Sequence, residues 1–154
     1  MKAKHLVAGA IVVAVVLASL VGWIAFATWR NMRFLHQREH SLLYQTDHQA
    51  ILDACRLMWK DGSKYGKDEG GYFYVDPDNR NLPEAVHLLD AHDITIWASG
   101  LNIELGGQGE HYGFESFFGD PATDSKRTVW KDAYPSTKLT PELYFYAESG
   151  IAAK

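Results

Sequence analysis

The chain of 154 residues has one cysteine, Cys55, and no cluster of lysine and arginine beyond the stretch that ends at Arg38. A single cysteine excludes an internal disulfide framework. Residues 30–154 carry 13 basic and 19 acidic side chains, a formal charge of about −6, whereas nucleic-acid binding requires a basic face. G-x-S-x-G and C-x-x-C motifs are also absent, so the sequence favours neither nucleic-acid binding nor a familiar catalytic class, and it implies no cofactor.

Residues 6–29 form a run of 24 positions without an ionisable side chain. About 20 apolar residues in a helix span the ~30 Å hydrocarbon core of a bilayer. Ala25-Phe26-Ala27 matches the pattern of a signal-peptide cleavage site, but the apolar stretch before it is longer than the roughly 15 residues typical of signal peptides. We therefore expect a retained, single-pass membrane anchor.

The charges that flank this run are nearly balanced. Lys2 and Lys4 lie on the short side, and Arg30, Arg33 and Arg38 lie on the long side, where we expect contact with lipid headgroups. The short basic tail of an N-terminal anchor favours a cytoplasmic N-terminus. We therefore expect the domain to be extracytoplasmic.

The composition after the anchor predicts one small α+β domain, in which a helix packs on an antiparallel sheet. The expected organisation is a tail and transmembrane anchor (1–29), a juxtamembrane helical stalk (30–45), a globular domain (46–148) and a C-terminal tail (149–154). About 125 residues suffice for one hydrophobic core.

A helix is predicted after Thr46, which forms a capping box with Gln49, and Gly62 supplies its stop. Its apolar residues recur at helical spacing and predict one core-facing side: Ile51, Ala54, Cys55, Met58 and Trp59. A strand at 72–75 and a short helix beginning with Pro83 at its first position are expected next, the latter with Ala85, Leu88 and Leu89 on its apolar side.

Residues 93–107 alternate between apolar and polar side chains and predict a β-hairpin. A turn at Ser99-Gly100 pairs Ile96 with Ile103 and Ile94 with Leu105. All apolar side chains then share one face. The opposite face carries Thr95, Trp97, Asn102 and Glu104.

Glycines at 106–109 predict a turn into a third strand at 111–117. Residues 119–142 predict a long loop containing a short strand at 128–130, and 143–147 a last strand.

Four short motifs resemble those of small bacterial membrane-anchored proteins to which no activity is assigned. They are Leu82-Pro83-Glu84-Ala85, Asn102-Ile103-Glu104-Leu105-Gly106-Gly107, His111-Tyr112-Gly113-Phe114 and Leu143-Tyr144-Phe145-Tyr146. The resemblance implies a bacterial α+β domain and supplies no activity that could be assigned to any residue.

Two local patterns resemble metal motifs but are better explained by structure. Residues 36–40 match H-x-x-E-H on a polar stretch close to the bilayer, where a solvated stalk explains them. Residues 76–81 begin like a calcium loop, but Arg80 and Asn81 occupy positions that need a ligand and a glycine. An Asx-rich turn is the simpler interpretation.

The expected function is therefore non-enzymatic binding of a protein or peptide near the membrane. The 17 aromatic side chains of residues 30–154 favour an interface. The candidate binding residues are Trp97, on the outer face of the hairpin, with Asn102, Glu104, His111 and Tyr112.

Two alternatives remain open. His87, His92 and His111 are candidate ligands of a metal-dependent hydrolase, and small residues along the anchor, from Gly9 to Gly22, suit a subunit that packs within a membrane complex.

Overall fold

The computed structural model describes residues 2–106, 111–119 and 130–148, with side chains described from residue 13 onward. The chain divides into two compact units, Met1–Arg38 and Glu39–Lys154. The predicted tail at 149–154, most of the predicted glycine turn and residues 128 and 129 of the predicted short strand lie outside the described residues.

Helix α1 (Lys2–Tyr44) is continuous through the predicted anchor and the predicted stalk. It is long and apolar enough to cross a membrane, and its large apolar side chains from Val13 to Trp29 are exposed. The hydroxyl groups of Ser19 and Thr28 donate to backbone carbonyls one turn earlier, each at 2.9 Å, so neither needs a partner from lipid. The chain therefore has one N-terminal apolar helix compatible with a single-span anchor.

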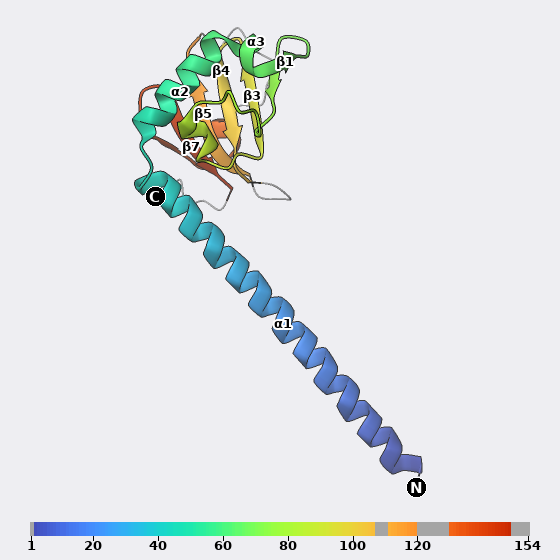
Figure 1. Cartoon of the computed structure of the whole chain (residues 1–154). Coiled ribbons are helices and arrows are strands. Elements are labelled where there is room, and N and C mark those ends of the chain that lie inside the picture. Colours follow the sequence, from blue (N-terminus) through green and yellow to red (C-terminus); the bar gives the residue numbers. More distant parts are fainter. Residues whose placement is uncertain (1, 107–110, 120–129, 149–154) are drawn as a thin grey trace. The chain divides into compact units, whose positions relative to one another are not determined.

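The second unit contains an antiparallel sheet of seven strands in the order β1-β2-β3-β4-β5-β7-β6 (Figure 1). The strands are β1 (Gly66–Asp68), β2 (Phe73–Val75), β3 (Asp93–Trp97), β4 (Gly100–Glu104), β5 (Tyr112–Phe117), β6 (Ser136–Lys138) and β7 (Leu143–Ala147). Together with its helices, this sheet confirms the predicted α+β fold.

The strand register separates the side chains into two faces. Ile94, Ile103, Phe114 and Phe145 lie in one row across four strands, and Ile96, Leu101, Ser116 and Leu143 lie in the next row of the same face. All eight are buried. We call this the helix face, because α2 (His48–Lys60) packs against it, with the His48 ring 6.3 Å from the Phe114 ring.

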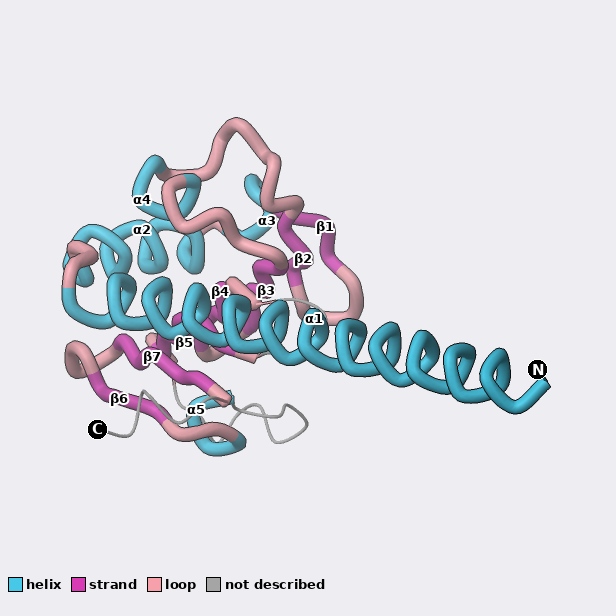
Figure 2. The backbone as a smooth tube through the Cα atoms, turned by 90° about the horizontal axis from the view of Figure 1, so that it is seen from below, coloured by secondary structure: helices cyan, strands magenta, loops and turns pink. Residues whose placement is uncertain are grey.

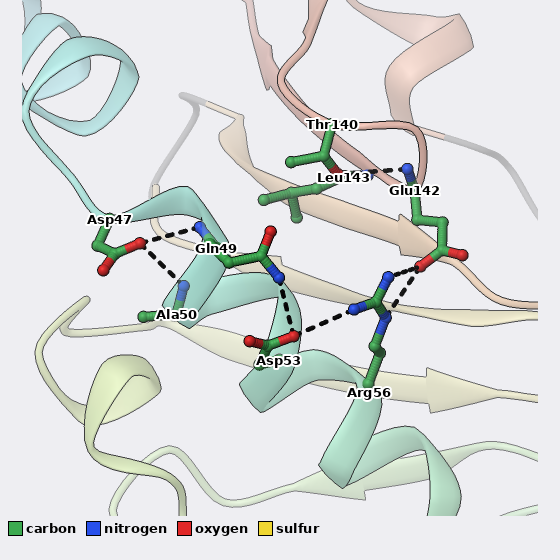
Figure 3. A network of polar contacts seen from close by, with 8 residues as sticks. All are labelled: Asp47, Gln49, Ala50, Asp53, Arg56, Thr140, Glu142 and Leu143. Carbon is green, nitrogen blue, oxygen red and sulfur yellow. Dashed lines mark hydrogen bonds and ion pairs between the residues drawn. The ribbon is translucent and has the colours of Figure 1, made fainter.

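Helix α2 begins one residue later than its predicted capping box. Asp47, not Thr46, is the N-cap, and its carboxylate accepts hydrogen bonds from the amides of Gln49 and Ala50 at 3.0 Å (Figure 3). A carboxylate at this position also interacts favourably with the helix dipole, which explains the preference over the threonine hydroxyl. Lys60 ends the helix two residues before Gly62, near the predicted stop.

The β3–β4 hairpin is confirmed, but its predicted register is wrong by two residues. Ile96 lies opposite Leu101, and Ile94 opposite Ile103, so the turn is Ala98-Ser99. The Ser99 carbonyl accepts hydrogen bonds from the amides of Phe118 and Gly119, at 2.9 and 3.1 Å, which fixes this turn from a distant segment. A shift of two residues preserves the face of every side chain.

The short helix at Pro83 is also placed differently. Pro83 precedes α4 (Glu84–His87) as its N-cap and is not its first residue. Val86 and Leu89 are buried, whereas Leu88 is 78% exposed, so the predicted apolar side is wrong at Leu88. The predicted long loop contains α5 (Trp130–Ala133) and β6. Helix α3 (Gly62–Tyr65) and β1 follow α2 directly.

Candidate functional site

Glu104 and His111 meet at the end of strand β4. The Glu104 side chain lies on the face opposite α2, and His111 precedes β5, so the two strands bring them together. His111 Nδ1 lies 2.8 Å from Glu104 Oε1, and their side chains are 38% and 15% exposed. A carboxylate accepts hydrogen bonds, so Nδ1 is the donor, and Nε2 has no hydrogen-bond partner among the described residues.

The His111 ring belongs to a cluster of four nearly parallel rings, with Trp130, Tyr134 and Tyr146. His111 lies 5.3 Å from Trp130 and 5.5 Å from Tyr134, and the latter two lie 5.5 Å apart. Three nearly equal distances describe a triangle, because the outer rings of a linear stack would be about twice as far apart. Tyr146 lies 6.2 Å from both Trp130 and Tyr134.

Helix α5 and the residue that follows it carry two of these rings, Trp130 and Tyr134, and are held against the sheet. The Lys131 amide donates to Glu115 Oε2 at 2.9 Å, and Ser136 Oγ donates to the Lys131 carbonyl at 2.9 Å. Glu115 is fully buried on β5. Figure 2 shows α5 and α2 on opposite sides of strands β4, β5 and β7, so we call the second face the α5 face.

Gly113 allows close approach beneath the ring cluster. A methyl group at this position would overlap the Ile103 carbonyl oxygen and would lie 2.9 Å from the Tyr146 hydroxyl. Tyr146 is fully buried, so its ring forms the base of the cluster. His111, Trp130 and Tyr134 are partly exposed and form its accessible part.

A polar row crosses the α5 face beside the ring cluster. Strand register places Thr95, Asn102, Glu115 and Tyr144 opposite one another on β3, β4, β5 and β7. The first three are buried, and Thr95 Oγ1 donates to Asp93 Oδ2 at 3.2 Å. Asn102 Oδ1 accepts no hydrogen bond from the described residues.

Trp97, predicted as a binding residue on the outer face of the hairpin, is buried in the structure. Its side chain is 3% exposed, its Nε1 donates to Ser99 Oγ at 2.8 Å, and its ring contacts Phe117 edge-on at 6.1 Å. Asn102 and Tyr112 are 1% and 2% exposed, so neither is available to a partner on the surface. Strand alternation assigned Trp97 and Asn102 to the correct face, but that face is covered at these two positions.

The three histidines predicted as metal ligands occupy different parts of the domain. His111 joins the ring cluster, whereas His87 is exposed at the end of α4 and His92 is exposed before β3, with its amide donating to the Glu104 carbonyl. Within residues 2–106, 111–119 and 130–148, no group of three or more His, Cys, Asp or Glu side chains is placed to hold a metal ion.

Sequence reasoning identified Glu104 and His111 but missed Trp130 and Tyr134. These aromatic residues occur in a stretch rich in proline and polar residues, where a packed core is not expected. Large aromatic side chains in such a stretch were the sequence feature that could have indicated a site. No known protein family, curated protein or solved structure matches the chain, so the site is interpreted from its own geometry.

Proposed function

We propose that the protein is a membrane-tethered recognition domain that binds a protein or peptide partner at the surface formed by Glu104, His111, Trp130 and Tyr134. We call this set the recognition surface. The observation that carries the proposal is the 2.8 Å contact of Glu104 with a half-exposed histidine ring that stacks on Trp130. A side chain oriented by a carboxylate and by ring stacking loses little further entropy when a partner binds.

The edges of the sheet favour this surface over strand addition. Both edge strands, β1 and β6, have three residues, and each carries an exposed lysine, Lys67 or Lys138. Short edges with lysine are typical of sheets that resist pairing with another strand. Side chains, not a backbone ladder, therefore supply the contacts in our proposal.

The recognition surface has the chemistry to bind arginine. Ring faces attract cations, and Arg stacks on aromatic faces more readily than Lys. Glu104 adds a carboxylate, and residues 30–154 carry a net charge of about −6, which favours a basic partner. We therefore propose an arginine-bearing segment as the partner.

Site-specific photo-crosslinking in native membranes tests this proposal. A photoreactive amino acid at Tyr134 should give a discrete crosslinked product, whereas the same group at the exposed Leu88, directly after α4, should not. Glu104→Gln and His111→Ala should each reduce the Tyr134 product. Identical products from positions 134 and 88, or a product that both substitutions leave unchanged, would contradict the proposal.

We also propose that the domain is extracytoplasmic, on the evidence of Lys2 and Lys4 in the short N-terminal tail. Fusions after Lys154 should give active alkaline phosphatase and non-fluorescent green fluorescent protein. Replacing Arg30, Arg33 and Arg38 should leave this orientation unchanged. Bright fluorescence from the native sequence would place the domain in the cytoplasm.

A further inference from the structure

A second concave site lies at the other end of the sheet, where α3, β1 and β2 meet. The pocket has a volume of about 440 Å³, within the range of small-molecule sites. Its lining residues come from one short stretch and from the strand paired with it: Lys64, Tyr65, Gly66, Lys67, Tyr74 and Asp76. None of them belongs to the recognition surface.

The floor of this pocket is fixed by close backbone packing. A methyl group at Gly66 would lie 2.6 Å from the Tyr74 carbonyl oxygen, so glycine lets β1 begin directly against β2. The Asn79 side chain donates to the Tyr65 carbonyl at 2.9 Å and holds the end of α3. The site is therefore built into the connection between α3 and β1.

The charges of the lining residues are unbalanced. Lys64 and Lys67 form no ion pair with any described residue, and the Lys64 ammonium lies 5.1 Å from the centroid of the Tyr65 ring. Asp76 accepts a hydrogen bond from the Asp78 amide at 3.0 Å, which engages one of its oxygens in a turn. Two ammonium groups and one carboxylate thus line the pocket, which gives it a local excess of one positive charge in a chain with a net charge of −4.

We propose that this pocket binds a small phosphate-bearing ligand through Lys64 and Lys67. A phosphate monoester presents three strong acceptor oxygens and close to two negative charges at neutral pH, so both ammonium groups can donate to it at once. The exposed Tyr74 ring offers an apolar surface and a hydroxyl group to the organic part of the ligand. The phosphate can belong to a soluble metabolite or to a lipid headgroup, because both present the same group.

Lysine acetylation followed by mass spectrometry tests the site in the full-length chain in phosphatidylcholine nanodiscs. Glycerol 3-phosphate at a concentration that fills about nine-tenths of the sites should slow acetylation of Lys64 and Lys67 roughly tenfold relative to the apo protein. Lys60, exposed on the last turn of α2 and outside the pocket, is the internal control. Sodium acetate at the same ionic strength should protect none of the three.

The same measurement distinguishes the two sources of phosphate. Protection by glycerol 3-phosphate supports a soluble ligand, and protection only in nanodiscs that contain phosphatidic acid supports a headgroup. Lys67→Gln should abolish protection at Lys64, whereas Lys60→Gln should not. Equal rates with and without every probe, or equal slowing at Lys60, would overturn the proposal. No residue of the recognition surface lines this pocket, so failure of the phosphate proposal would not affect the crosslinking test, and failure of the crosslinking test would not affect the phosphate proposal.

Discussion

The two faces of the central sheet differ in what they bury. The helix face buries aliphatic and aromatic side chains with Ser116 as its one polar member among the eight residues of its two central rows. The α5 face buries Thr95, Asn102 and Glu115 and continues into a partly exposed ring cluster. Burial of polar groups costs free energy unless hydrogen bonds compensate it, and here Thr95 and Glu115 are hydrogen-bonded, whereas Asn102 Oδ1 has no partner among the described residues. The helix face therefore supplies most of the apolar packing of the sheet, and the α5 face carries the recognition surface of our proposal.

Removal of a phenylalanine from each face of the same strand is the strongest test of this comparison. Phe114 is fully buried on the helix face, whereas Phe117 is partly exposed on the α5 face. Phe114→Ala should lower the free energy of unfolding by about 3–5 kcal/mol, and Phe117→Ala by about 1–2 kcal/mol. Denaturant unfolding of the full-length chain in detergent, followed by tryptophan fluorescence, measures both. Equal losses would show that the two faces contribute alike.

Cys55 provides a pH-dependent test of the same helix face. Burial raises the pKa of its thiol from 9.0 to about 12. A raised folded-state pKa means that the unfolded chain loses its thiol proton first, so stability falls as the pH rises from 9 toward 12. The loss should reach about 2 kcal/mol by pH 10.5.

Comparison with Cys55→Ala isolates this contribution, because tyrosine and lysine titration affects both proteins. The variant should have a shallower decline in unfolding free energy above pH 9, whatever its stability at pH 7. Parallel curves for the two proteins would mean that solvent reaches the thiol and that the helix face is less closed than its burial indicates.

The comparison also separates what the sequence could predict from what it could not. Alternation in β3 and β4 assigned Ile94, Ile96 and Ile103 to one face, because a strand places every second side chain on the same side. The cross-strand partner of each residue was not predictable. The turn is fixed by hydrogen bonds from the Phe118 and Gly119 amides to the Ser99 carbonyl, and these residues are too distant in the sequence for a local pattern to reveal the contact.

Local sequence patterns also could not predict whether other segments cover a face of the sheet. Trp97 was assigned to the face where a partner would bind, but the polarity of its neighbours gave no sign that the face is covered. Elements of three or four residues, such as β1, α3 and β6, are too short to produce a period. Glu104 and His111 were found by residue type, whereas their stacking partners depended on the placement of α5.

Gly113→Ala sharpens the comparison by testing how tightly the α5 face is packed beneath the recognition surface. The added methyl group would overlap the Ile103 carbonyl and press on the Tyr146 hydroxyl. We expect a loss of about 1–3 kcal/mol in unfolding free energy, as for other overpacked sites. Gly22→Ala is the matched control, because nothing lies within 4 Å of its added methyl group. An unchanged free energy of unfolding for Gly113→Ala would indicate that the ring cluster moves readily to accommodate the methyl group and is not preorganised.

The smallest effect is expected at the rim of the helix face, where Arg56 on α2 reaches Glu142 before β7 (Figure 3). Arg56 Nε and Nη2 lie 3.0 and 2.6 Å from Glu142 Oε2, and this contact raises the pKa of the guanidinium. Both side chains are well exposed, at 42% and 38%, so water and salt screen the attraction. Glu142→Gln should therefore lower the unfolding free energy less than Gly113→Ala does. The difference from wild type should shrink further in 0.5 M salt, measured by the same denaturant unfolding. A large loss that persists in salt would show that this bridge, and not apolar packing alone, fastens α2 to the sheet.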